Sequence, residues 1–151
     1  MEIVELSQRP AQVKEAINYF WKCWGNTTNF SFYEDCITHS LAANSALPKF
    51  YLALDEQQIV GSYALLVNDI ISRQDLMPWF ACLHVNEDRR GQGLAAQLLE
   101  HGRREAHHKG FAQLYLSSDL ENFYERKGWS YFGKGFNVFG DAIKIYSVST
   151  T

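Results

Sequence analysis

The sequence predicts a mixed α/β (α+β) fold in which helices flank a mostly antiparallel central sheet. Apolar residues make up 46% and charged residues 21% of the 151 positions, the balance of a globular chain. Segments with helical spacing of apolar residues are interspersed with short runs rich in β-branched and aromatic residues. One run, Trp79 to Val85, is almost wholly apolar, as in a strand that helices cover on both faces. The predicted order of elements is β-α-α-β-β-β-α-β-α-β-β.

The N-terminal third is predicted to contain one short strand and two helices. Residues Ile3–Leu6 are expected to form the strand. A helix is expected after Pro10, because proline favours a first helical turn and apolar residues then recur at helical spacing as far as Gly25. A second, shorter helix is expected between Phe32 and Leu41.

The middle of the chain is predicted to form a hairpin followed by the buried strand. Phe50–Leu54 and Ile59–Val67 are apolar runs separated by the polar turn Asp55–Gln57, a pattern typical of two antiparallel strands. The polar stretch Asn68–Pro78 then leads into the strand Trp79–Val85.

The remaining elements alternate between helix and strand and end in an antiparallel pair. A glycine is expected to stop each of the two helices. We expect a loop at Asn86–Gly93, a helix from Leu94 to about Lys109, a strand at Ala112–Leu116, a short helix at Leu120–Lys127, and strands at Trp129–Phe132 and Ala142–Val148. Because no repeat or linker-like tract interrupts the chain, we expect a single domain over residues 1–151.

Composition and cysteine usage exclude several classes of protein. The net charge of −3 argues against a general nucleic-acid binder, which would carry a basic surplus. Cys23, Cys36 and Cys82 form no CxxC pair and have no histidine at zinc-ligand spacing, so no metal is expected. The N-terminal residues do not resemble a signal peptide, and no apolar run is long enough for a membrane span. A soluble chain in the reducing cytoplasm is the expectation.

The segment Arg90-Gly91-Gln92-Gly93-Leu94-Ala95 carries the clearest chemical signal. A buried strand is expected to deliver the chain to these two glycines, and a helix is expected to start directly after them. Glycine lets backbone N–H groups approach a ligand, and the first N–H groups of a helix have no partner within it. These features, with the helix dipole, predict an anion site suited to a phosphate or pyrophosphate.

Two other interpretations of this segment remain open. It is compatible with a plain strand-to-helix turn whose arginines are solvated. Residues 91–96 also fit the dinucleotide-binding pattern G-x-G-x-x-A. That pattern usually opens a domain of repeated βαβ units, whereas here some 80 residues precede it and no second parallel half follows.

The whole stretch resembles the acetyl-CoA-binding motif of the GCN5-related N-acetyltransferase (GNAT) superfamily. Arg90–Ala95 has the form R-x-x-G-x-A, and the family motif is Q/R-x-x-G-x-G/A after an apolar strand. About 30 residues downstream, Phe123–Trp129 resembles the family segment F-Y-x-K/R-x-G-F. The expected order of strands also matches the family fold from Ile3 to Val148, so the resemblance covers essentially the whole chain.

The resemblance implies how acetyl-CoA, the co-substrate, would be held. Backbone amides of the Arg90–Ala95 segment would hold the pyrophosphate, and the backbone of the preceding strand would pair with the pantetheine arm. Tyr124 matches the family tyrosine that donates a proton or hydrogen bond to the leaving thiolate, although such an aromatic can also serve packing alone. The implied cofactor-binding residues are Leu83, His84, Val85, Arg90, Gly91, Gln92, Gly93, Leu94, Ala95 and Tyr124.

A general base is needed as well, because an ammonium ion has no lone pair with which to attack. Family members commonly carry a carboxylate near the start of the central strand. Asp75 is the first candidate, Asp69 the second, and His84 the third, the last because an imidazole titrates near neutrality. Each has a plain alternative: the aspartates can cap the loop or pair with Arg73, and His84 can be a buried structural histidine.

The resulting prediction is an acetyl-CoA-dependent N-acetyltransferase that moves the acetyl group directly to a primary amine in a ternary complex. Aromatic residues and carboxylates in the expected acceptor regions suit a cationic amine, either a small molecule or a peptide. A non-catalytic acyl-CoA-binding module is the alternative from another class. Neither nucleic acid nor a membrane is expected as a partner, and a homodimer is compatible with the sequence.

Overall fold

The computed structural model describes residues 1–42 and 44–151, whose strands form a seven-stranded sheet in the order β1-β2-β3-β4-β5-β7-β6. The register pairs β1–β2, β5–β7 and β6–β7 antiparallel and β4–β5 parallel. The predicted mixed, mostly antiparallel sheet is therefore confirmed. The chain forms two compact units, which are described in turn. The first unit comprises residues 1–64 and 82–98, and the second comprises 65–81 and 99–151.

In the first unit, β1 (Glu2–Glu5) pairs with β2 (Lys49–Asp55), and a tight turn connects β2 to β3 (Gln58–Leu66). The two turn residues, Glu56 and Gln57, both have positive φ, 51° and 71°. Hairpins favour such turns because their twist matches the twist of the strands. The predicted hairpin is confirmed, and each of its strands differs from the prediction by one residue at each end.

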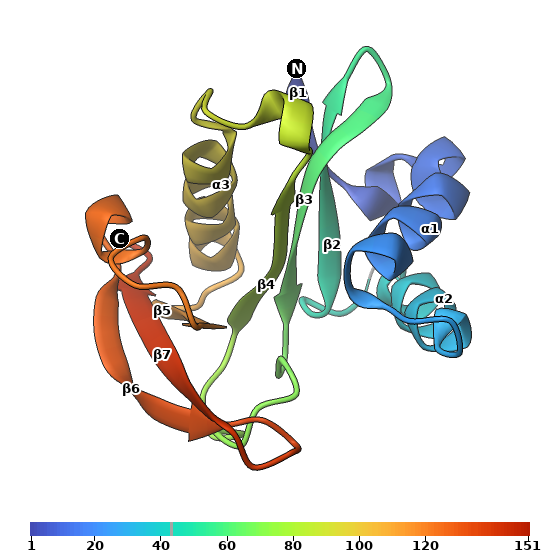
Figure 1. Ribbon diagram of the computed structural model, residues 1–151. Helices are drawn as coiled ribbons and strands as arrows, with labels where there is room; N and C mark the ends of the chain where they lie inside the picture. Colours follow the sequence, from blue (N-terminus) through green and yellow to red (C-terminus); the bar gives the residue numbers. More distant parts are fainter. Residues whose placement is uncertain (43) are drawn as a thin grey trace. The chain divides into compact units, whose positions relative to one another are not determined.

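Two helices, α1 (Val13–Trp24) and α2 (Phe30–Ser40), lie beside β2 in Figure 1. Helix α1 buries Phe20 on its apolar face, where the ring meets the ring of Phe50 edge-on at 5.1 Å between centroids. Gly25 ends α1 as predicted, and the reason is space. A Cβ at this position would lie 2.3 Å from the Trp21 side chain, so only glycine fits.

Strand β4 (Trp79–Val85) has the predicted bounds, but its two halves differ. Trp79, Phe80 and Ala81 are buried, as expected for a strand covered on both faces, whereas Cys82, Leu83 and His84 are only half-buried. Cys82 has a φ of 57°, which is uncommon for a residue with a side chain, and this kinks the strand. The Ser62 hydroxyl donates to the Cys82 carbonyl (3.0 Å) and holds the kink. The expectation of full burial is thus wrong for residues 82–84, whereas Val85 at the end of the strand is buried again.

In the second unit, β7 (Ala142–Ser149) pairs with both β5 (Gln113–Ser118) and β6 (Ser130–Phe136) (Figure 1). The predicted antiparallel pairing of the last two strands is confirmed. A core cluster of this unit centres on three buried side chains, Ile71, Trp79 and Ile145. It ties the β3–β4 loop to the sheet of the same unit.

Helix α3 (Leu94–His108) ends one residue before the predicted limit. Gly110 has a φ of 91°, and its N–H donates to the carbonyl of His107 (2.9 Å) in the left-handed stop that glycine permits. The helix predicted over Leu120–Lys127 is wrong. Only the 3₁₀ turn Glu125–Lys127 forms, because Asn122 adopts a φ of 62° and so interrupts a regular helix.

Candidate active site

In the first unit, β4 leads through a 3₁₀ turn (Glu87–Arg89) into the segment with the two glycines. Gly91 and Gly93 have φ angles of 77° and 81°, which side chains rarely tolerate. A Cβ at either position would meet nothing within 4 Å. The glycines are therefore required by backbone conformation and not by crowding, and the space beside the turn is open.

The backbone N–H groups from Gly91 to Ala96 all lack an acceptor within the described part of the chain. The first bond of this helix start is Gln97 N–H to Gly93 O, at 3.1 Å. A helix N-terminus with open donors carries about half a positive charge. This turn can therefore receive an anion through several main-chain hydrogen bonds at once.

The two arginines before the glycines have different roles. Arg89 forms an ion pair with Asp55 (Nη1 to Oδ2, 2.5 Å), which holds the turn to β2 and largely neutralises the arginine's charge. Arg90 is exposed, and its Nε donates to the Val85 carbonyl (3.0 Å). That bond ties the guanidinium to the end of β4, and its terminal nitrogens make no hydrogen bond or ion pair within the described part of the chain. Arg90 is thus the arginine better suited to add charge to the anion site.

His84 lies half-buried between the rings of Tyr19 and Trp24, at 5.8 and 6.0 Å between centroids. Burial and the positive charge of Arg90 lower the pKa of His84, so the imidazole is neutral at neutral pH. Tyr19 donates to Asn86 Oδ1 (2.6 Å), and Asn86 donates from its backbone to Val60 O (2.9 Å). Sequence reasoning missed Tyr19 and Asn86, which together fix the end of β4; a polar residue directly after an apolar strand was the available signal.

In the second unit, Tyr124 is buried among aromatic rings. Phe123 meets it edge-on at 4.9 Å, and Tyr146 and Trp129 lie at 5.7 and 6.3 Å between centroids. Burial raises the pKa of Tyr124, and a hydrogen bond with Ser118 partly offsets this effect. The phenol therefore keeps its proton at neutral pH and can donate it.

The two aspartates of the β3–β4 loop differ sharply. Asp75 is exposed and accepts two hydrogen bonds from Arg73, at 2.9 and 2.8 Å, and this partner lowers the pKa of Asp75. Asp69 accepts no hydrogen bond and faces no cation among the described residues, and burial raises its pKa to about 6. A carboxylate with a raised pKa is the stronger base. The structure thus favours Asp69 over Asp75, which reverses their order from the sequence.

The structure brings part of the predicted site together. In the first unit, the Arg90 side chain joins the Arg90–Ala95 turn to the Leu83–Val85 segment. In the second unit, no described contact joins Tyr124 to Asp69 or Asp75. Within the described part of the chain, no three His, Cys, Asp or Glu side chains are arranged to hold a metal ion. None of the helices in that part has both the length and the apolar character that a membrane span needs.

Residues 46–131, more than half of the chain, match the model of the acetyltransferase (GNAT) domain. The chain belongs to the GNAT acetyltransferase family. The resemblance carried by Arg90–Ala95 and Phe123–Trp129 is confirmed at the level of the family, and so is the predicted enzyme class, a GNAT-type N-acetyltransferase. No curated protein sequence matches this chain.

Solved structures of GNAT enzymes share the fold along the chain. An aminoglycoside 6′-N-acetyltransferase in complex with coenzyme A has a TM-score of 0.73 at 15% identity, over 100% of this chain and 98% of its own. A spermidine N-acetyltransferase chimera from Vibrio cholerae and hSSAT has a TM-score of 0.71 at 15% identity, over 99% and 96%. A GNAT family acetyltransferase from Elizabethkingia anophelis with acetyl-CoA bound has a TM-score of 0.58 at 18% identity, over 76% and 80%.

Proposed function

We propose that this protein transfers the acetyl group of acetyl-CoA directly to a primary amine of a small molecule, within a ternary complex. The observation that carries the proposal is the run of open backbone N–H groups from Gly91 to Ala96 at the start of α3. A pyrophosphate carries two negative charges on closely spaced oxygens, which such a run can bind together. The family match supplies the reaction class.

The second half of β4 is proposed to bind the pantetheine arm through its backbone. The kink at Cys82 and the partial exposure of Leu83 and His84 support this, since a strand buried on both faces would offer a ligand no access. Kinks of this kind are frequent next to active sites. Arg90 is proposed to contact the pyrophosphate with the terminal nitrogens of its guanidinium.

Asp69 is proposed as the general base and Tyr124 as the acid. Asp69 takes a proton from the acceptor, directly or through water, so that the neutral amine attacks the thioester carbonyl carbon. A C–N bond forms, the C–S bond breaks, and the sulfur receives a proton from the Tyr124 hydroxyl. The attacking nitrogen loses its second proton as the amide forms; this proton returns to Tyr124 through water, and Asp69 releases its own to solvent. The products are the acetylated amine and the free thiol of coenzyme A. Direct transfer needs no acyl-enzyme intermediate.

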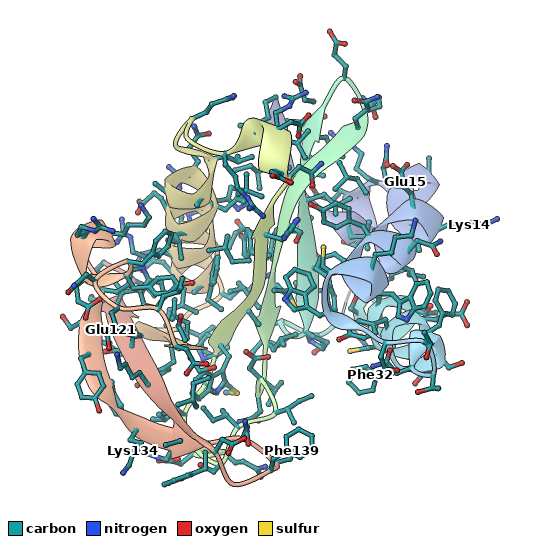
Figure 2. The ribbon with its side chains drawn as sticks, in the orientation of Figure 1. Lys14, Glu15, Phe32, Glu121, Lys134 and Phe139 are labelled. Carbon is teal, nitrogen blue, oxygen red and sulfur yellow. The ribbon has the colours of Figure 1, made fainter. Side chains whose placement is uncertain are left out.

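The acceptor is proposed to be a small cationic amine. The β6–β7 hairpin of the second unit exposes aromatic rings, above all Phe139, which is 85% exposed (Figure 2). Rings and carboxylates suit an amine that carries positive charge. The enzymes named above for aminoglycosides and spermidine have the same fold and by their names act on small amines. A peptide amine is the other acceptor compatible with the sequence.

We also propose that residues 1–151 act as one catalytic domain in the reducing cytoplasm. None of the three cysteines forms a disulfide in the described part of the chain, which suits that compartment.

Calorimetric titration with acetyl-CoA and with NAD(P) tests the donor assignment. We expect a one-to-one complex with acetyl-CoA and no heat with NAD(P), and the reverse result would restore the dinucleotide interpretation of residues 91–96. A rate assay with spermidine, an aminoglycoside and a short peptide then tests the acceptor class. Transfer to the peptide alone would overturn the small-amine proposal, and binding without transfer to any amine would favour a non-catalytic module.

A further inference from the structure

The β3–β4 loop holds Asp69 in a closed turn of the second unit. The Asn68 side chain spans this turn, because its Oδ1 accepts from Ile71 N–H (2.9 Å) and its Nδ2 donates to Arg73 O (3.3 Å). Ile70, which follows Asp69 directly, has a φ of 53°. A β-branched residue is strained in this region, so the surrounding contacts must impose the conformation.

Ser72 joins this loop to β6 through two reciprocal hydrogen bonds. Its N–H donates to Phe136 O (2.9 Å), and its Oγ accepts from Phe136 N–H (3.0 Å). Strand β6 is the last in the sheet order, so no further strand can satisfy these groups. Ser72 supplies the partner that another strand would provide.

Gly135, next to Phe136 on β6, makes room for the same loop. A Cβ at Gly135 would lie 3.0 Å from Ile71 Cδ1 and 3.0 Å from Ile145 Cδ1, closer than side chains normally approach. Ile71 is buried in the core cluster and can reach it only over the bare backbone of Gly135. One position further, the Arg73 guanidinium lies over the Phe132 ring at 5.6 Å. Three consecutive loop residues, Ile71, Ser72 and Arg73, thus contact strand β6.

From these contacts we propose that Ser72 and Gly135 are positioning residues for acetyl transfer, which hold the Asp69 loop on β6 so that its carboxylate meets the acceptor amine. This inference rests on the proposed function, in which Asp69 is the base. The contacts leave Asp69 as the loop carboxylate without a partner, because Arg73 occupies Asp75. A base that is displaced by about 1 Å can lose up to about 100-fold in rate, so a loop fixed at three points has a direct kinetic value.

Ser72→Ala removes the hydroxyl acceptor and keeps the backbone bond. We expect kcat to fall about tenfold, a partial displacement on the same scale, while the KM for acetyl-CoA stays unchanged. The acid limb of the rate profile should move to lower pH, because a loosened loop lets water reach Asp69. Ser72→Thr keeps the hydroxyl and should restore both. Ser130→Ala, the same change at an exposed position of β6, is the matched control and should leave kcat unchanged.

A double-mutant cycle with Asp69→Asn separates positioning from general stability. The rates are compared near pH 8, where the acceptor amine is still mostly protonated and transfer depends on the base. If Ser72 acts through Asp69, Ser72→Ala costs nothing further in the Asp69→Asn background. An equal loss in both backgrounds, or an unchanged kcat in Ser72→Ala itself, would overturn the proposal.

The cycle also tells the two proposals apart. If Asp69→Asn alone keeps the wild-type rate and pH profile, the base lies elsewhere and it is the proposed function that fails. Gly135→Ala provides a second approach to positioning, by pressing on Ile71 instead of removing a hydrogen bond. We expect the same kinetic pattern as in Ser72→Ala, a lower kcat with an unchanged KM for acetyl-CoA. If Gly135→Ala does not fold, the Ser72 variants alone test the positioning proposal.

Discussion

The turn after β4 and the loop before it differ in whether their backbone groups form hydrogen bonds. In the turn of the first unit, the N–H groups from Gly91 to Ala96 have no acceptor among the described residues. In the loop of the second unit, Asn68 and Ser72 bind the backbone of the loop and of β6. N–H donors without an acceptor suit a segment that binds a ligand. Backbone groups that already have hydrogen-bond partners suit a segment that holds a side chain in place.

This difference predicts a division of labour that kinetics can detect. A segment that binds the donor alike in ground and transition states affects KM and Kd, whereas a group that acts only during transfer affects kcat. We therefore expect variants of the turn to weaken acetyl-CoA binding and variants of the loop to slow the chemistry. A turn variant that lowers kcat, or a loop variant that weakens acetyl-CoA binding, would contradict this division.

The largest effect is expected for Asp69→Asn. Loss of a general base typically costs about 10²–10⁴ in rate, and we expect this loss in kcat without a change in the Kd of acetyl-CoA. The base must be deprotonated, so the wild-type rate should fall as pH drops through about 6, the value that burial sets for the pKa of Asp69. In Asp69→Asn, this fall of the rate at low pH should be absent.

Asp75→Asn is the matched control, since it is the same change six residues further on in the same loop. Arg73 already occupies the carboxylate of Asp75 and lowers its pKa, so its loss should alter kcat little. A greater loss from Asp75→Asn than from Asp69→Asn would restore the order of candidates that the sequence alone suggested.

Tyr124→Phe should have the next largest effect, a fall in kcat of about 100-fold with an unchanged Kd for acetyl-CoA. The substitution removes the proton donor and keeps the ring among Phe123, Trp129 and Tyr146. Tyr131→Phe, at an exposed position of β6, is the control and should change neither constant. If Tyr124→Phe transfers acetyl groups at the wild-type rate, this tyrosine serves packing alone.

Gly93→Ala tests the turn itself. A left-handed alanine costs about 1–2 kcal/mol, so the Kd of acetyl-CoA should weaken roughly tenfold while kcat at saturation stays unchanged. Gly140→Ala is a matched control, because Gly140 also has a positive φ (87°) and open space around a new Cβ. A similar loss of affinity in both variants would show that the effect reflects general destabilisation.

The features that were predicted correctly depend on residues close together in the sequence. The glycine pair at 91 and 93 and the helix after it could be located because each is a local pattern, whereas the helix predicted around Tyr124 does not form. The family resemblance, which also rests on such patterns, added the expected fold along the whole chain. Glycine conformation and helix ends are set by neighbours, which a sequence displays directly.

The features that were missed depend on contacts between distant segments. The sequence shows that Asp69, Arg73 and Asp75 share a loop, but it does not show that Arg73 pairs with Asp75 while burial acts on Asp69. The kink at Cys82 could not be predicted either, because alternation and composition carry no information on φ. In both places tertiary contacts override the local pattern.

The smallest effect we predict is on stability, and its sign differs between the two aspartates. Asp69 has a folded pKa raised from 3.8 to about 6, so between these values the folded chain holds a proton that the unfolded chain releases. Stability therefore falls as pH rises through this window, and Asp69→Asn removes the penalty. We expect its Tm to exceed that of the wild type by about 2–4 °C near pH 8, with no gain near pH 4.

Asp75→Asn should lower Tm slightly near pH 8, because the pKa of Asp75 is lowered by Arg73 and the ion pair stabilises the folded chain once the carboxyl is charged. Thermal unfolding of both variants at the two pH values checks the signs; a gain for Asp69→Asn at pH 4 as well would show that its carboxylate carries no burial penalty and is not the tuned base of this loop.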